Sequence, residues 1–141
     1  TMDHLGQLMQ LGFLENLERL HMGSNAVTAT GVESLLEPLR RERMKNLTQI
    51  FLPLNTLYAE GMNLMMSAQT LGVFDHLEEL DVSDCGCNKE VMALFGRAIM
   101  SRDALGLLKL RKLRLFGTVP NARRLAKGIF PEEFIIKCGV C

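Results

Sequence analysis

The stretch that decides the fold is LTQIFLPLNTL, which runs from residue 47 to residue 57. Four apolar residues and one asparagine hold fixed places in it, namely Leu47, Ile50, Leu52, Asn55 and Leu57. Ile50 and Leu52 alternate with their neighbours, as residues on one face of a β-strand do. We therefore predict a short strand whose apolar side chains point into a core, followed by a turn at Asn55. Leu57 then returns the chain to the core.

The same frame recurs with starting points at residues 17, 77 and 110. Successive starting points lie 30, 30 and 33 residues apart, so each unit has room for a strand and a helix. The asparagine position is occupied along the chain by Asn25, Asn55, Cys85 and Thr118. A side-chain amide can satisfy backbone groups in a turn. We therefore expect these residues to form a ladder of hydrogen bonds along a stack of units.

The segments between the strands carry apolar residues at helical spacing. We predict helices over residues 2–10, from about residue 30, over 60–70, over 89–102 and from 121 to about 127. Thr30 and Glu33 match a capping box, and Asn88 and Asn121 are the other expected N-caps. Pro38 should kink its helix or end the regular part of it.

The tail, residues 131–141, has no repeat frame. Phe134, Ile136 and Cys138 alternate there, which predicts a short final strand that covers the end of the stack. The chain is thus expected to form one domain with six parts: a helix of a truncated repeat (1–16), repeats at 17–46, 47–76, 77–109 and 110–130, and a cap or tail (131–141). Because the first part lacks its strand, we expect a segment of a longer array.

The frame matches the template LxxLxLxxNxL, and the sequence resembles the leucine-rich-repeat proteins of the ribonuclease-inhibitor-like subfamily over about residues 5–130. Gly31 and Gly61, each six residues after the frame asparagine, belong to this resemblance. It implies an α/β fold, a right-handed β-α solenoid with a parallel sheet on the concave side and helices on the convex side. Members of that family are mostly protein-binding scaffolds, and some inhibit enzymes, regulate GTPases or sense ligands.

Composition excludes several classes of function. Apolar residues make up 48% and charged residues 23% of the 141 residues, as in a folded domain. The 16 basic and 16 acidic residues cancel, which argues against a broad surface for nucleic acid or anionic membrane. No apolar run is long enough to span a bilayer. Four cysteines do not make a disulfide framework, so we expect an intracellular protein, cytoplasmic or nuclear.

The candidate binding residues alternate with the buried ones on the predicted strands and face outward: Arg19, His21, Gln49, Phe51, Glu79, Asp81, Lys112, Arg114 and Phe116. Parallel in-register stacking places Glu79 beside Lys112 and Asp81 beside Arg114. These pairs either neutralise one another or form a bipolar patch, for which Phe51 and Phe116 would be aromatic anchors.

The cysteines could form a closed zinc site, from Cys85 and Cys87 with Cys138 and Cys141. The one-residue spacing of the first pair is shorter than zinc sites use, and both residues already have places in the frame. A redox disulfide in the terminal pair remains an alternative to free thiols. None of His4, His21 and His76 lies in a nucleophile, metal or phosphate motif. We expect no catalytic residue, metal or cofactor.

The sequence therefore predicts a non-catalytic scaffold that binds a protein partner through the concave face of its sheet. Two alternatives remain, an architectural spacer within a longer repeat protein and a regulator of a small GTPase. Further repeats, or a second copy of the chain in a weak homo-oligomer, are the other partners that exposed repeat ends allow.

Overall fold

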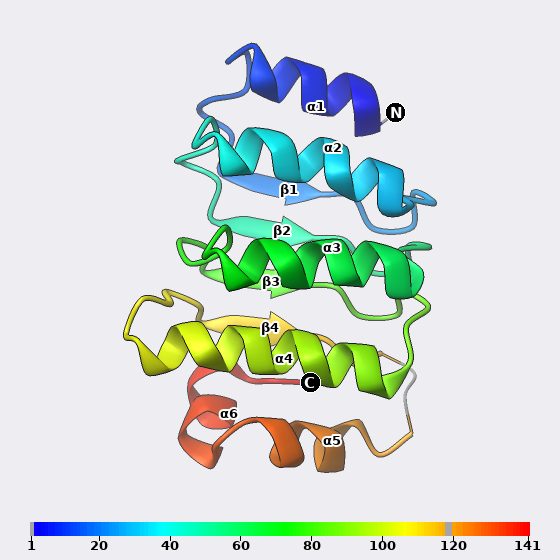
Figure 1. Cartoon of the computed structure of the whole chain (residues 1–141), viewed down its shortest axis with the longest axis vertical. Coiled ribbons are helices and arrows are strands. Elements are labelled where there is room, and N and C mark those ends of the chain that lie inside the picture. Colours follow the sequence, from blue (N-terminus) through cyan, green and yellow to red (C-terminus); the bar gives the residue numbers. More distant parts are fainter. Residues whose placement is uncertain (1, 118–119) are drawn as a thin grey trace.

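The computed structural model describes residues 2–117 and 120–141, and within them the chain is an α/β fold with a parallel sheet. The described strands are β1 (Arg19–His21), β2 (Gln49–Phe51), β3 (Glu79–Asp81) and β4 (Lys112–Arg114). The described helices are α1 (Met2–Gln10), α2 (Ala29–Arg40), α3 (Tyr58–Thr70), α4 (Lys89–Ala104), α5 (Ala122–Ile129) and α6 (Glu132–Cys138). Figure 1 shows α1 to α4 side by side in one layer against the sheet.

The four strands lie in the sheet in the order in which they occur in the chain. Arg19 pairs with Gln49, Gln49 with Glu79 and Glu79 with Lys112, so the strands stand in the predicted register. The central residue of each strand is buried, and these residues are Leu20, Ile50, Leu80 and Leu113. The repeating strand–helix order thus buries one face of the sheet under the helix layer.

Most of the predicted helices are confirmed, with shifts of about two residues at their ends. α1 has the predicted bounds, α3 begins two residues earlier than predicted, and α4 ends two residues later. The cap at Asn88 is confirmed, because its side-chain oxygen accepts a hydrogen bond from the Val91 N–H at 2.9 Å.

Two predicted caps are wrong. α2 begins at Ala29 after an extended Thr28, so Thr30 lies inside the first turn and cannot act as N-cap. Asn121 does precede α5, but it has a left-handed backbone and its side chain makes no capping bond. Pro38 lies in the last turn of α2, and the helix continues past it to Arg40.

The predicted final strand is also wrong, because the tail forms helix α6. In a strand, Phe134, Ile136 and Cys138 would share one face. In the helix, Phe134 and Cys138 share the buried face and Ile136 is 76% exposed. The chain then returns to the sheet, where the Cys141 carbonyl accepts hydrogen bonds from the N–H groups of Leu115 and Phe116 at 2.8 and 3.1 Å.

No helix within residues 2–117 and 120–141 is both long enough and apolar enough to cross a bilayer.

Candidate functional site

The face of the sheet that points away from the helices carries eight of the nine predicted contact residues. We call it the outer sheet face, and it consists of Arg19, His21, Gln49, Phe51, Glu79, Asp81, Lys112 and Arg114. On β1 and β4 these side chains are exposed, and on β2 they are half-buried. Because every strand contributes residues at the same two levels, the side chains form two parallel rows across the sheet.

An aromatic pair lies at one end of the second row. The rings of His21 and Phe51 stack with centroids 4.3 Å apart and planes inclined by 22°. This contact follows from the pairing of His21 with Phe51 in the β1–β2 register. Both residues were predicted on this face, but their stacking was not, although the 30-residue step aligns them. The pair forms a flat, partly exposed aromatic surface on β1 and β2, and Arg19 lies two residues before His21 on β1.

Opposite charges face each other in the half of the outer sheet face formed by β3 and β4. The Lys112 Nζ lies 3.9 Å from a carboxylate oxygen of Glu79, which confirms the predicted neighbours. The other Glu79 oxygen accepts a hydrogen bond from the Gln49 amide at 3.4 Å. These contacts link β2, β3 and β4 through their side chains, although such exposed pairs contribute little to stability.

Asp81 was predicted to be an exposed contact residue, and this is wrong, since it is only 4% exposed. One of its oxygens accepts hydrogen bonds from the Ser83 N–H at 3.0 Å and the Ser83 hydroxyl at 2.6 Å. Its other oxygen lies 3.7 Å from the Arg114 guanidinium, which is exposed. The buried Asp81 therefore forms an ion pair with the exposed Arg114 from beneath the sheet surface. Ser83 is not among the predicted contact residues, although its spacing of two residues from an aspartate is typical of such local bonds.

Phe116 was predicted to be a second exposed aromatic anchor, and this is also wrong, since it is 5% exposed. The prediction extended the alternation of β4 beyond Arg114, where the strand ends. Leu115 and Phe116 are consecutive and both are buried. Their N–H groups both donate to Cys141, so the returning tail covers this position.

The predicted turn ladder is present at Asn55 and Cys85. The Asn55 side-chain oxygen accepts hydrogen bonds from the N–H groups of Asn25 and Val27 at 3.0 and 2.9 Å. Its amide donates to the carbonyls of Met22 and Leu52 at 2.8 and 2.9 Å. The fourth predicted member, Thr118, lies outside the described residues.

Cys85 continues the ladder with a weaker donor. Its thiol donates to the Leu52 carbonyl at 3.2 Å, and burial raises the pKa of this thiol to about 11. By contrast, Asn25 is exposed, and its amide bonds only the nearby carbonyl of Gly23 at 2.7 Å. Asn55 and Cys85 therefore join neighbouring units from buried positions, whereas the Asn25 side chain lies at the surface.

Burial raises the pKa values of three thiols, those of Cys85, Cys87 and Cys138, which makes them poor nucleophiles at neutral pH. Burial raises the pKa of Cys87 to about 12 and that of Cys138 to about 11. All four cysteines are free. In the described part of the chain, no three His, Cys, Asp or Glu side chains come together as metal ligands would. Burial also lowers the pKa of His76, whose Nε2 has no hydrogen-bond partner.

No protein-family model matches the sequence, and a search of curated proteins finds no match either.

Proposed function

We propose that this chain is a leucine-rich-repeat scaffold, similar to the ribonuclease-inhibitor-like family, that binds a protein partner without catalysis. In this proposal the β-α units form a right-handed solenoid, and the outer sheet face is its concave side. Repeated strands in one register, with side-chain bonds to the preceding unit from the turns after β2 and β3, support this assignment. The chain would need no metal or cofactor, and its four free thiols fit a cytoplasmic or nuclear setting.

The observation that carries the proposal is the His21–Phe51 stack on an exposed part of the sheet. An aromatic side chain on the outer face contributes nothing to the core beneath the helices, whereas aromatic residues are common energetic centres of protein interfaces. Arg19 lies beside the stack on β1, and Lys112 and Arg114 lie across the sheet on β4. A partner with an apolar group between acidic groups fits this arrangement.

The mechanism is pre-organisation. Backbone pairing of the strands fixes the spacing of the side chains before a partner arrives, so little conformational entropy is lost on binding. Asp81 and Ser83 add to this by holding the Arg114 side chain from below.

The proposal is tested by affinity capture from lysate of the source cells, followed by mass spectrometry. We compare the unchanged chain with Phe51→Ala combined with Arg114→Ala, and with His21→Ala alone. Phe13→Ala combined with Arg43→Ala is the matched control, because both residues are exposed and lie away from the outer sheet face. A protein that the control retains and both test variants lose, at unchanged melting temperature, supports the proposal.

Equal capture by all variants contradicts a role for the outer sheet face. If neither the unchanged chain nor any of its variants captures a partner, the spacer alternative is favoured.

A further inference from the structure

A groove between α4 and α5 is a feature of the helix layer that the sheet-binding proposal leaves unused. Two adjoining hollows of about 390 and 360 Å³ lie along it. They share the residues Lys89, Ala93, Arg97 and Leu125, so they form one continuous surface, which we call the α4–α5 groove. Figure 1 shows α5 lying along α4 at the C-terminal end of the helix layer.

The floor of the groove is apolar and closely packed. A Cβ atom at Gly96 would lie 2.9 Å from side-chain atoms of both Ile129 and Phe130, so the glycine lets α5 approach α4 closely. At Gly128, on the other side, a Cβ atom would meet nothing within 4 Å. The groove is therefore closed at its base and open above. Leu94, which is 45% exposed, and Leu125 present apolar surface along it.

The walls of the groove are positively charged. Three cationic side chains line it, namely Lys89, Arg97 and Arg124, and Glu90 is the one acidic lining residue. The sequence of α5, ARRLAKGI, adds two more cations and contains no acidic residue.

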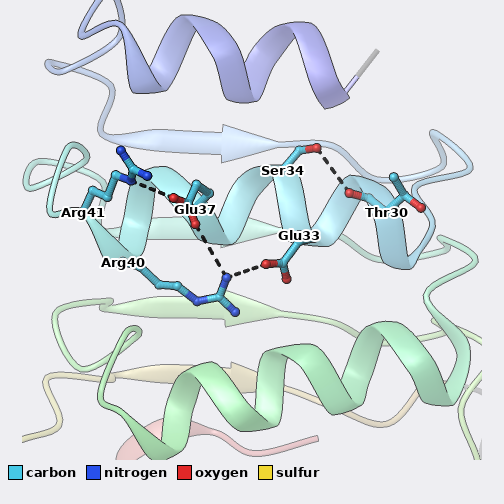
Figure 2. A network of polar contacts seen from close by, with 6 residues as sticks. All are labelled: Thr30, Glu33, Ser34, Glu37, Arg40 and Arg41. Atoms are coloured by element: carbon cyan, nitrogen blue, oxygen red, sulfur yellow. Dashed lines mark hydrogen bonds and ion pairs between the residues drawn. The ribbon is translucent and has the colours of Figure 1, made fainter.

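These cations differ from the two arginines at the end of α2. There, Arg40 and Arg41 are paired with Glu33 and Glu37 of that helix, as Figure 2 shows. None of Lys89, Arg97 and Arg124 forms an ion pair within residues 2–117 and 120–141. In a chain whose net charge is zero, this is a local excess of uncompensated positive charge next to an apolar floor.

We propose that the α4–α5 groove binds an acidic peptide segment of a partner protein. Carboxylates of the segment meet Lys89, Arg97 and Arg124, and an apolar side chain between them lies against Leu94 and Leu125. The charge of the walls selects an anion. The apolar floor favours a peptide over a nucleic acid, because no aromatic ring lines the described part of the groove for base stacking.

The binding test uses fluorescence anisotropy with a fluorescein-labelled peptide of sequence EELEELEE. The same peptide with serine for leucine measures the apolar contribution, and the peptide with lysine for glutamate measures the charge requirement. An oligodeoxythymidine of similar length and phosphatidylserine vesicles represent the two other polyanionic partners. All titrations are made at low and at physiological salt, since screening weakens exposed charge contacts.

The protein variants separate the groove from charge in general. Arg97→Glu combined with Arg124→Glu should weaken binding of the acidic peptide at least about tenfold. Arg43→Glu combined with Lys109→Glu changes the net charge equally at two exposed cations outside the groove, and should leave the affinity within about twofold. Leu94→Ser should weaken peptide binding about threefold to tenfold, because it removes apolar contact at an already exposed position.

Equal loss in the groove variant and its matched control overturns the proposal, as does failure of the acidic peptide to bind at low salt. Binding of the oligonucleotide or the vesicles that is as tight as peptide binding, and that Leu94→Ser does not change, overturns the assignment to a peptide. Selective loss in Arg97→Glu with Arg124→Glu and in Leu94→Ser supports it. The outer sheet face is intact in all of these variants, so the two proposals fail independently.

Discussion

The two ends of the sheet are built from the same strand pattern and finished in different ways. At the C-terminal end, the backbone of Cys141 hydrogen-bonds the backbone of β4 and of the two residues that follow β4. Helices α5 and α6 come after β4 in the chain and complete this end. At the N-terminal end, β1 is the first strand of the described sheet, and the surface beside it exposes Leu8, Leu11 and Phe13. A β-α unit buries its apolar surface against its neighbour, so an end needs a different segment to close it. The segment that closes the C-terminal end is the tail, which has no repeat frame.

The largest effect is expected at the closed end, from Phe134→Ala. Phe134 is 3% exposed and its ring stacks on that of Phe130 with centroids 5.2 Å apart. Truncation leaves a cavity, so the free energy of unfolding should fall by about 3 to 5 kcal/mol. Urea denaturation followed by circular dichroism measures this change.

Ile136→Ala on the same helix is the control for Phe134→Ala. Its side chain is among the most exposed, so its effect should stay within about 0.5 kcal/mol. Similar losses in the two variants would mean that α6 does not close the end of the sheet in the way described.

The second largest effect is expected at the asparagine position of the frame, which is buried at Asn55 and exposed at Asn25. Asn55 is buried and bonds five backbone groups, two of them N–H groups of the preceding turn. Asn55→Ala removes the partner of these two N–H groups and should cost about 2 to 4 kcal/mol of unfolding free energy. Asn25→Ala removes one exposed contact and should cost less than about 1 kcal/mol. Equal denaturation midpoints would contradict the ladder.

The repeat frame was enough to predict the four strands, their register and most of the helices. The fixed spacings of Leu, Ile and Val indicate which residues are buried, and the 30-residue step aligns the first three strands. The same step also places His21 beside Phe51 and Glu79 beside Lys112. The parts of the outer sheet face that depend on strand alternation alone were therefore predictable.

The errors lie where tertiary contacts override the local pattern. Phe116 has the outward parity of β4, but the returning tail covers it. Asp81 has outward parity too, but Ser83 and Arg114 enclose its carboxylate. In the tail, Phe134 and Cys138 fit a strand face and a helix face equally well, and only packing against the last repeat decides between them. The α4–α5 groove needs two helices to be placed together, which the sequence of either helix does not reveal.

The smallest effect is expected at the open end, from Phe13→Arg. Phe13 is 73% exposed, and the equivalent residue one repeat later is Arg43, which is exposed as well. A charge is thus already accommodated at this position of the unit, and the free energy of unfolding should change by less than about 0.5 kcal/mol. The substitution should instead reduce concentration-dependent self-association, because it places a charge beside the exposed side chains of Leu8 and Leu11. Sedimentation velocity over a range of concentrations measures the association, and urea denaturation measures the stability. A loss of stability like that of Phe134→Ala would mean that the N-terminal surface is packed in solution, and the contrast between the two ends would then be wrong.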